Sequence, residues 1–598
     1  MKTIITITFI LAGTVNSLYA QTADLEFKLN EYFDGIAQFG FSGTVIVGDK
    51  TSVIYSSPFG FADKKEERKN TSSTVFTTGS ITKVFTALII LDLENKRLLS
   101  LDDPITKYVK NVPDDKKDIT IRHLLSHTSG IKRNDLPGGD TNLEATKKAV
   151  LIDLLDSELL FEPGEKQEYS NIAYTLLAII AENIEGSEYE DILYNRITKP
   201  AKMYQTGYHL PQYKNIDLAK GYRGNNEIPA VINLPQLEDG LTWNLRGNGG
   251  IHSNIFDMYR FFIALSNNQL IDQKMLHEMI QKPSVSVNEN RYYGLGFEVL
   301  IEENKKDISH SGGNGYFASD FHWLIDEGKM FYIATNEGNL NIGQISENIK
   351  NIIRNLPYNE PPKLREVSDE NLKRLEGWYR LTDIDSLQIT AHTTYLSLST
   401  QSNALIKKIY SGMSPSTEDV ANKYAAESKR VLEQEFVGNF NPKYEAMNGS
   451  TSINNLKRYH SYDADCWLEN FGLYKSVDMV AAKGTKEFTF VLLKINFESG
   501  AAAELFTWRK GVLSNISVIP DWTDFEFNIK LYPIWPTGFQ SYNISNPLHT
   551  NAKLNLEENE SVIILGEMQL RRIENRGCFY KKALEGLNSN SRGFTPGQ

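Results

Sequence analysis

The chain has few cysteines, no surplus of positive charge, and no internal repeat or low-complexity tract. Only Cys466 and Cys578 occur among the 598 residues, far downstream of the motifs described below, so we expect neither to be catalytic. In an oxidising compartment they could pair; otherwise they are two independent buried thiols. The formal net charge of −12 offers no electrostatic footprint for DNA, RNA or anionic lipid, which predicts no nucleic-acid partner.

No segment after the N-terminal apolar run has the pattern of a membrane helix either. Ile4 to Ala12 is apolar, follows Lys2, and leads through small and polar residues to Ala20. This pattern predicts a signal peptide over residues 1–20; a buried helix or a single membrane anchor is the alternative, and the run is short for a membrane span. We therefore expect a periplasmic or secreted protein with no integral membrane segment once the signal is removed.

Residues 21–356 have the pattern of one domain, and the full length is too great for a single hydrophobic core. Hairpin patterns lie near both ends of this region, at 41–55 and 321–335. Between them, Val84 to Leu93 is apolar without Gly or Pro, as in a buried helix. Strands at both ends with helices between predict an α+β fold in which one antiparallel sheet is closed by the ends of the domain.

A proline-rich linker, predicted over 357–366, separates this domain from a different C-terminal region. We expect a β-barrel-like appendage over 367–411 and 523–576, interrupted by an α+β insertion over 412–522 whose helix begins near Ser416. Neither assignment rests on a motif. This region could shape substrate access, bind the cell envelope or hold an oligomer together.

The first chemical motif is Ser80-Ile81-Thr82-Lys83, at the start of the apolar helix. A serine hydroxyl becomes a good nucleophile when a neighbouring group takes its proton and the resulting oxyanion is stabilised. Residues three apart share a helix face, and burial would lower the pKa of Lys83 so that it can act as a base. The same pattern recurs at Ser129-Gly130-Ile131-Lys132, but there a glycine in a turn-like stretch argues against a helix.

The second motif is Tyr169-Ser170-Asn171, which precedes a buried-helix pattern. A phenol near a lysine can shuttle a proton to a leaving group. The amide of Asn171 can hold both the lysine and a substrate carbonyl. Tyr213-Lys214-Asn215 has the same spacing, but it lies in a polar stretch with no apolar helix behind it.

The third motif, His310-Ser311-Gly312-Gly313, directly precedes the second hairpin. Small residues would let a substrate lie along the strand, with the backbone N–H groups of Ser80 and Gly313 as oxyanion donors and His310 as polar lining or proton relay. A zinc site at His123 and His127, four residues apart, is the alternative use of histidine. The intervening residues lack the glutamate of a zincin, so we predict no metal.

In this order, the three motifs resemble the serine β-lactamase and penicillin-binding-protein superfamily. The likeness is closest to the branch of class C β-lactamases, D-alanyl-D-alanine carboxypeptidases and esterases, in which Tyr-x-Asn replaces Ser-x-Asn. Connecting segments agree over roughly residues 25 to 355, namely Leu101–Ile105, Ile119–Ile131, Gly247–Ile251, Tyr293–Phe297 and Gly313–Tyr316.

The resemblance implies a fold, a reaction and a set of roles. The expected fold is an antiparallel sheet flanked by helices beside a mostly helical subdomain, with the serine in the cleft between them. Ser80 would be the acylated nucleophile, Lys83 its proton partner and Tyr169 the general base and acid. Asn171 would orient the lysine and the substrate, and the third motif would line the sheet edge. No metal or organic cofactor is implied.

One departure from the family pattern concerns the substrate. Most β-lactamases have Lys-Thr-Gly where this chain has His310-Ser311-Gly312, and a histidine is mostly neutral at pH 7. Recognition of a substrate carboxylate is therefore in doubt. The sequence predicts a serine hydrolase that cleaves an ester or amide of a small molecule or peptide. The alternative is a sensor or envelope-binding module that is acylated without turnover.

Overall fold

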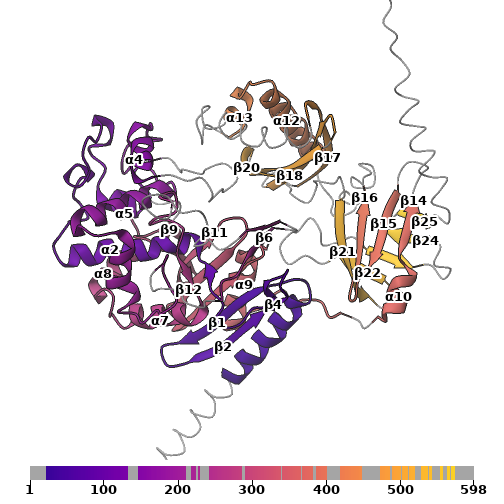
Figure 1. The fold of residues 1–598 in the computed structure, drawn as a ribbon, viewed down its shortest axis with the longest axis horizontal. Coiled ribbons are helices and arrows are strands. Elements are labelled where there is room, and N and C mark those ends of the chain that lie inside the picture. Colours follow the sequence, from indigo (N-terminus) through magenta and orange to yellow (C-terminus); the bar gives the residue numbers. More distant parts are fainter. Residues whose placement is uncertain are drawn as a thin grey trace, which may run out of the picture. The chain divides into compact units, whose positions relative to one another are not determined.

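A computed structural model of the chain divides into two compact units, one up to Pro361 and one from Pro362 (Figure 1). The predicted signal peptide, both cysteines, Lys132 and Tyr213 lie outside the residues that the structure describes. Those residues are 22–131, 146–209, 217–223, 226–228, 242–285, 290–338, 340–364, 367–380, 386–400, 418–447, 472–484, 488–499, 501–509, 511–518, 527–535, 538–541, 553–556, 562–565 and 568–572.

The first unit is built on a seven-stranded antiparallel sheet of order β2-β1-β13-β12-β11-β10-β9. Strands from the two ends of the unit are neighbours in it, since Gly43 to Asp49 pair with Thr335 to Lys329. This arrangement confirms the predicted α+β class and the closure of the sheet by the ends of the domain. The strands are β1 (Gly43–Asp49), β2 (Val53–Phe59), β9 (Arg291–Tyr293), β10 (Glu298–Glu302), β11 (Lys305–Gly313), β12 (Ala318–Leu324) and β13 (Lys329–Thr335).

Helices cover both faces of this sheet, and the side chains of β12 alternate between them. Phe321 contacts Phe261 of α7 with ring centroids 5.6 Å apart. Asp320, its neighbour, instead accepts a hydrogen bond from Ser346 of α9 at 2.7 Å. The two helices are α7 (Ile255–Ser266) and α9 (Ile342–Ile353).

A helix over residues 22–37 packs against β2 and α9 through Phe33 and Tyr32. Other helices form a subdomain around the predicted buried helix, which is α2 (Thr82–Asn95). It is apolar on nearly all sides because it packs against several helices, as its uniform hydrophobicity predicts. Its neighbour α5 (Asn171–Glu185) begins at a cap in which Ser170 Oγ accepts the Ala173 N–H, and it ends at Gly186 in the left-handed conformation. The other helices here are α3 (Ile121–Leu125), α4 (Lys147–Asp156), α6 (Tyr189–Leu193) and α8 (Gln273–Met279).

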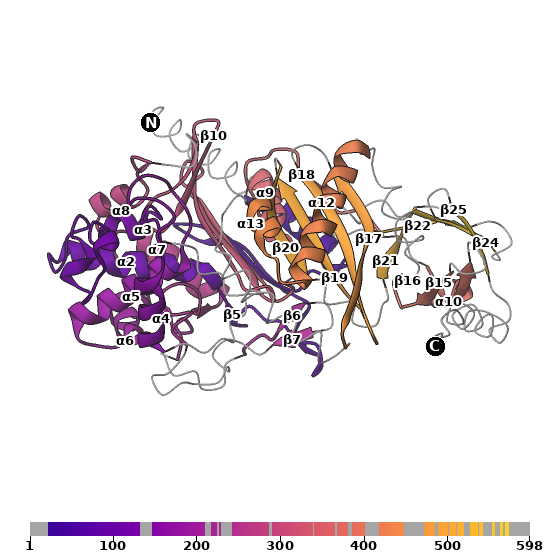
Figure 2. The ribbon, with the colours of Figure 1, turned by 90° about the horizontal axis from the view of Figure 1, so that it is seen from above.

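The second unit contains a closed antiparallel barrel and a separate four-stranded sheet. In the sequence, the sheet falls between β16 and β21, which are paired neighbours in the barrel. Helix α12 (Glu418–Phe436) packs on β17 and β18, and Figure 2 shows it lying across these strands. The barrel strands are β14 (Gly377–Arg380), β15 (Ser386–Ala391), β16 (Leu396–Thr400), β21 (Phe527–Trp535), β22 (Gly538–Ser541), β23 (Lys553–Leu556), β24 (Val562–Leu565) and β25 (Met568–Arg572). The sheet strands are β17 (Tyr474–Gly484), β18 (Phe488–Phe497), β19 (Ala501–Arg509) and β20 (Val512–Val518).

The described residues also bear on the predictions about membrane and metal. None of their helices is both long enough and apolar enough to cross a bilayer. Within the same residues, no group of three or more His, Cys, Asp or Glu side chains is placed to hold a metal ion. The limits predicted for the C-terminal domains remain predictions.

Candidate active site

Ser80 lies on a tight turn that leads from strand β5 (Phe76–Thr77) into α2. The turn is a single 3-10 turn, η1 (Gly79–Ile81), and α2 follows it at Thr82. The sequence predicted that an α-helix begins at Ser80, whereas the structure has one 3-10 turn there, which is narrower than an α-helical turn. Lys83 therefore lies on the first turn of α2, where its Nζ donates a hydrogen bond of 3.2 Å to Ser80 Oγ.

Lys83 is fully buried, and a backbone carbonyl holds its amine from the other side. Its Nζ donates to the carbonyl oxygen of Asn248 at 2.8 Å. The Asn248 side chain is itself fixed, because its Nδ2 donates to Thr175 Oγ1 and to the Asn244 carbonyl, both at 2.7 Å. The sequence marked the glycine-rich segment around Asn248 as typical of the family but did not identify this contact.

Glycines bring the end of β11 against the Ser80 turn. A Cβ atom at Gly79, where φ is +55°, would lie 2.3 Å from the Gly313 nitrogen. A Cβ atom at Gly312 would lie 2.0 Å from the Thr78 oxygen and 2.7 Å from the Ser80 nitrogen. Such distances exclude any side chain at either position. The backbone amides of Ser80 and Gly313 are thus close together, as a pair of oxyanion donors must be.

Hydrogen bonds from three elements support this turn. Thr78 donates to the Ile251 oxygen through both N–H and Oγ1 at 2.9 Å. Ser319 of β12 donates to the Thr78 oxygen at 2.7 Å. Thr82 Oγ1 donates to the Gly79 oxygen at 2.7 Å and accepts the Ile251 N–H at 3.1 Å. The position of Ser80 is therefore set by the sheet and by the 247–251 segment as well as by α2.

Tyr169 lies beside the serine–lysine pair, immediately before the cap of α5. The centroid of its half-buried ring is 4.9 Å from Lys83 Nζ. Asn171 is the first residue of α5 and follows Tyr169 by two positions. Ser80, Lys83 and Tyr169, predicted from separate motifs, come together.

His310 faces the same group from β11, with its ring centroid 6.4 Å from that of Tyr169. Its Nδ1 lies 2.7 Å from the Ser311 oxygen. Because a carbonyl can only accept, the proton is on Nδ1, and Nε2 is an acceptor. Within the described residues this buried Nε2 has no hydrogen-bond partner. Burial, together with the charge of Lys83, lowers the pKa of His310 to about 4, so the ring is uncharged at neutral pH.

The competing sequence motifs fall elsewhere. Ser129 is buried in a turn, where its Oγ accepts the Ile131 N–H at 3.3 Å and the next residue, Gly130, has φ of +74°. His123 and His127 do not share a helix face. His123 caps α3 by accepting the Thr120 N–H, whereas His127 lies beyond the end of that helix with φ of +58°.

Two residues that line the Tyr169 side of the site were not predicted as functional. The ring centroid of His127 is 4.4 Å from that of Tyr169, and the ring centroid of Tyr293 is 5.6 Å from it. A histidine in a turn-like Thr-Ser-Gly context was the only local signal for His127. Tyr293 is the last residue of β9 and pairs with Glu298 of β10. The sequence marked the segment from Tyr293 to Phe297 as typical of the family but did not place Tyr293 beside Tyr169.

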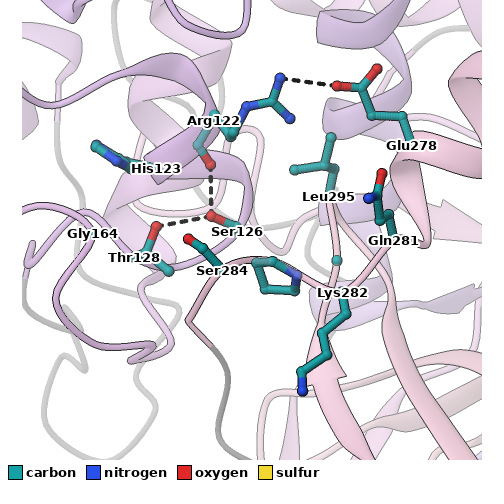
Figure 3. A pocket seen from close by; sticks show the side chains of 12 residues that line it. Arg122, His123, Ser126, Thr128, Gly164, Glu278, Gln281, Lys282, Ser284 and Leu295 are labelled. Atoms are coloured by element: carbon teal, nitrogen blue, oxygen red, sulfur yellow. Dashed lines mark hydrogen bonds and ion pairs between the residues drawn. The ribbon is translucent and has the colours of Figure 1, made fainter. Parts of the chain in front are cut away.

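A pocket of about 290 Å³ lies between α3 and the segment after α8 (Figure 3). Arg122 and Glu278 form an ion pair of 2.9 Å across it. Ser126 Oγ donates to the Arg122 oxygen at 2.8 Å and lies 2.9 Å from Thr128 Oγ1. None of the residues predicted for catalysis lines this pocket.

An antiparallel sheet flanked by helices, with a serine–lysine pair where a buried helix begins, is the architecture of penicillin-recognising serine hydrolases. A family model described as Beta-lactamase matches residues 33–342, more than half of the chain, which therefore belongs to this family of serine hydrolases. This confirms the resemblance noted in the sequence.

The chain is similar to several characterised relatives. It is 29% identical to penicillin-binding protein 4* of Bacillus subtilis over 380 residues, which cover 60% of this chain and 83% of that protein. It is 24% identical to the teichoic acid D-alanine hydrolase of Staphylococcus aureus over 320 residues, covering 53% and 76% respectively. A solved structure, the octameric penicillin-binding protein homologue of Pyrococcus abyssi, is 18% identical with a TM-score of 0.49, covering 92% of this chain and 99% of that one.

Proposed function

We propose that the chain hydrolyses a D-aminoacyl ester or amide through an acyl-enzyme on Ser80. The observation that carries this proposal is the buried amine of Lys83, bonded to Ser80 Oγ at 3.2 Å and lying beside the Tyr169 ring. A hydroxyl that shares its proton with a buried amine is prepared to attack a carbonyl.

The reaction proceeds in two steps. Ser80 Oγ attacks the substrate carbonyl carbon, and its proton passes through Lys83 and Tyr169 to the leaving oxygen or nitrogen as that bond breaks. The N–H groups of Ser80 and Gly313 stabilise the negative oxygen that forms in between. Water then attacks the acyl-enzyme; its proton returns to Ser80 by the same groups, and the carboxylic acid leaves.

The substrate class follows from His310 and from the relatives. An uncharged His310 supplies no cation for a substrate carboxylate, which favours esters and amides whose ends are neutral. The similarity to a teichoic acid D-alanine hydrolase supports a D-aminoacyl group as the part that is transferred to Ser80.

Substitution of the nucleophile tests this proposal. Ser80→Ala should lower the hydrolysis of p-nitrophenyl acetate by more than about 1,000-fold, because the nucleophile is lost. Ser129→Ala is the matched control and should retain most activity, since Ser129 only accepts a backbone N–H. Steady-state rates and the mass of the acylated protein are measured together.

Two results would contradict the proposal. An active Ser80→Ala variant, or loss of activity in Ser129→Ala alone, would show that another serine is acylated. One equivalent of released p-nitrophenol without turnover would instead favour a sensor that is acylated only once.

A further inference from the structure

His127 holds the backbone on both sides of Tyr169. Its carbonyl oxygen accepts the Glu168 N–H at 2.8 Å. Its Nδ1 accepts the Ser170 N–H at 3.1 Å. An accepting Nδ1 carries no proton, so the ring is neutral with its hydrogen on Nε2. One residue thus holds the Gln167–Glu168 and the Tyr169–Ser170 peptide units.

The ring of His127 also packs on the phenol itself. Its centroid is 4.4 Å from that of Tyr169, with an interplanar angle of 31°, and 5.1 Å from that of Tyr174. Only 2% of His127 is exposed. Aromatic rings at these separations attract one another and restrict rotation. The contact therefore limits the orientations that the Tyr169 ring can take.

The backbone of His127 is held in a conformation that most residues avoid. Its φ of +58° lies in the left-handed region, which is unfavourable for residues other than glycine, although histidine and asparagine enter it more readily than most. Local strain of this kind persists where the surrounding structure imposes it, and it is frequent at functional sites. This conformation lets a single residue present both its carbonyl and its ring to the 168–170 segment.

A second ring confines Tyr169 from another side. Tyr293 lies 5.6 Å from Tyr169 and 5.1 Å from His127, measured between ring centroids. The side chain of Gln167 binds the Tyr293 backbone twice, accepting its N–H at 3.1 Å and donating to its oxygen at 2.9 Å. It also donates to the Ser126 oxygen at 2.8 Å. Gln167 thereby links the backbone of Tyr293 to that of Ser126, the residue before His127.

From these contacts we infer that His127 is a positioning residue that fixes the Tyr169 phenol against Lys83, an inference that rests on the proposed function. His127 acts through Tyr169 and does not itself touch the substrate. Proton transfer depends steeply on the placement of the donor and acceptor. Removal of the ring should therefore slow acylation while leaving substrate binding nearly intact.

The test is a double-mutant cycle between His127→Asn and Tyr169→Phe. Asparagine tolerates a positive φ and keeps an acceptor near the Ser170 N–H, so this variant should fold while losing the ring contact. Acylation by p-nitrophenyl acetate is followed by intact-protein mass spectrometry over hours, so that the slow variants remain measurable. His123→Asn is the matched control, because His123 also accepts a backbone N–H through Nδ1 but, within the described residues, makes no ring contact with Tyr169.

We expect His127→Asn to lower kcat by about 10- to 100-fold with KM changed by less than about threefold. In the Tyr169→Phe background, the same substitution should have almost no further effect. His123→Asn should leave kcat within about twofold of the wild type, although it removes a helix cap and lowers the melting temperature.

Equal losses from His127→Asn in both backgrounds would overturn the inference, since the residue would then act independently of Tyr169. A wild-type kcat in His127→Asn would overturn it as well. The proposed function is tested separately by Ser80→Ala, and it is wrong if that variant remains active.

Discussion

At the scale of one residue, the neutral ring of His310 is the basis of the substrate preference that we propose. Its Nδ1 proton is committed to the Ser311 oxygen, and burial keeps the ring neutral far below pH 7. A lysine at this position would instead present a cation. The proposed selectivity therefore depends on one residue and one proton.

The corresponding prediction uses two substrates that differ only in charge. A D-alanyl depsipeptide with a free terminal carboxylate should be hydrolysed at pH 7 with a kcat/KM no more than about threefold above that of its methyl ester. A hydrogen bond to a charged group contributes about 1.5–3 kcal/mol, so a cation in the site would raise the ratio to about 10–150. Competition kinetics with both substrates measure it directly.

A large preference for the free carboxylate would show that a cation other than His310 lines the site. Rapid hydrolysis of nitrocefin, at rates comparable with those for esters, would also indicate such a cation. Either finding would remove the argument for neutral substrates.

At the scale of elements, the site depends on how closely η1 approaches the end of β11. Two glycines permit this approach, because a Cβ atom at either position would overlap backbone atoms of the other element. The amide pair of Ser80 and Gly313 is therefore a product of the contact between a turn and a strand.

Substitution of Gly79 tests this contact. Gly79→Ala should lower kcat/KM by about 100-fold, because its Cβ would displace the Gly313 amide. Gly328→Ala is the control: Gly328 has a similar φ of +62° but nothing within 4 Å of the added atom. Both variants should lose about 1–2 kcal/mol of stability from the left-handed backbone, measured by urea unfolding. Activity that falls equally in both would mean that backbone strain, and not the contact, limits the site.

At the scale of the whole first unit, stability depends on a buried ionic group between the sheet and α9. The His322 ring lies 2.9 Å from Asp307 and 3.2 Å from Asp320. Burial alone would lower the pKa of His322, but the two carboxylates outweigh it and raise that pKa to about 10. Lys350 of α9 lies 3.6 Å from Asp307 and adds a second cation.

This group predicts how stability varies with pH. The folded pKa of His322 lies above its ordinary value of 6.5, so its contribution is fully present below pH 6.5 and is lost as the pH rises toward 10. His322→Gln should lower the free energy of unfolding by about 3–5 kcal/mol at pH 6, because it leaves two buried carboxylates short of a cation. The same substitution should matter much less at pH 10.

Urea unfolding of the full chain at several pH values between 6 and 10 measures this dependence. His277→Gln, on the exposed face of α8, serves as the control and should leave both the stability and its pH profile unchanged. A pH profile in His322→Gln identical to that of the wild type would exclude His322 as its source.

Much of this protein could be predicted from local sequence. The apolar run that became α2 and the two hairpins that became β1–β2 and β12–β13 follow from short-range periodicity and turn residues. The three motifs around Ser80, Tyr169 and His310 indicated the family, because their residue types and order reflect chemistry that needs no knowledge of packing. Contacts that join distant segments could not be predicted in this way.

The sequence by itself determined the α+β class, the family and the side chains that carry the proposed reaction. Only the tertiary structure decided the register in which β1 pairs with β13, how closely the Ser80 turn approaches the end of β11, and that His127 and Tyr293 enclose Tyr169. These features depend on burial and on distances between residues far apart in the chain. Periodicity and spacing report only on near neighbours, so they leave such contacts open until the chain is packed.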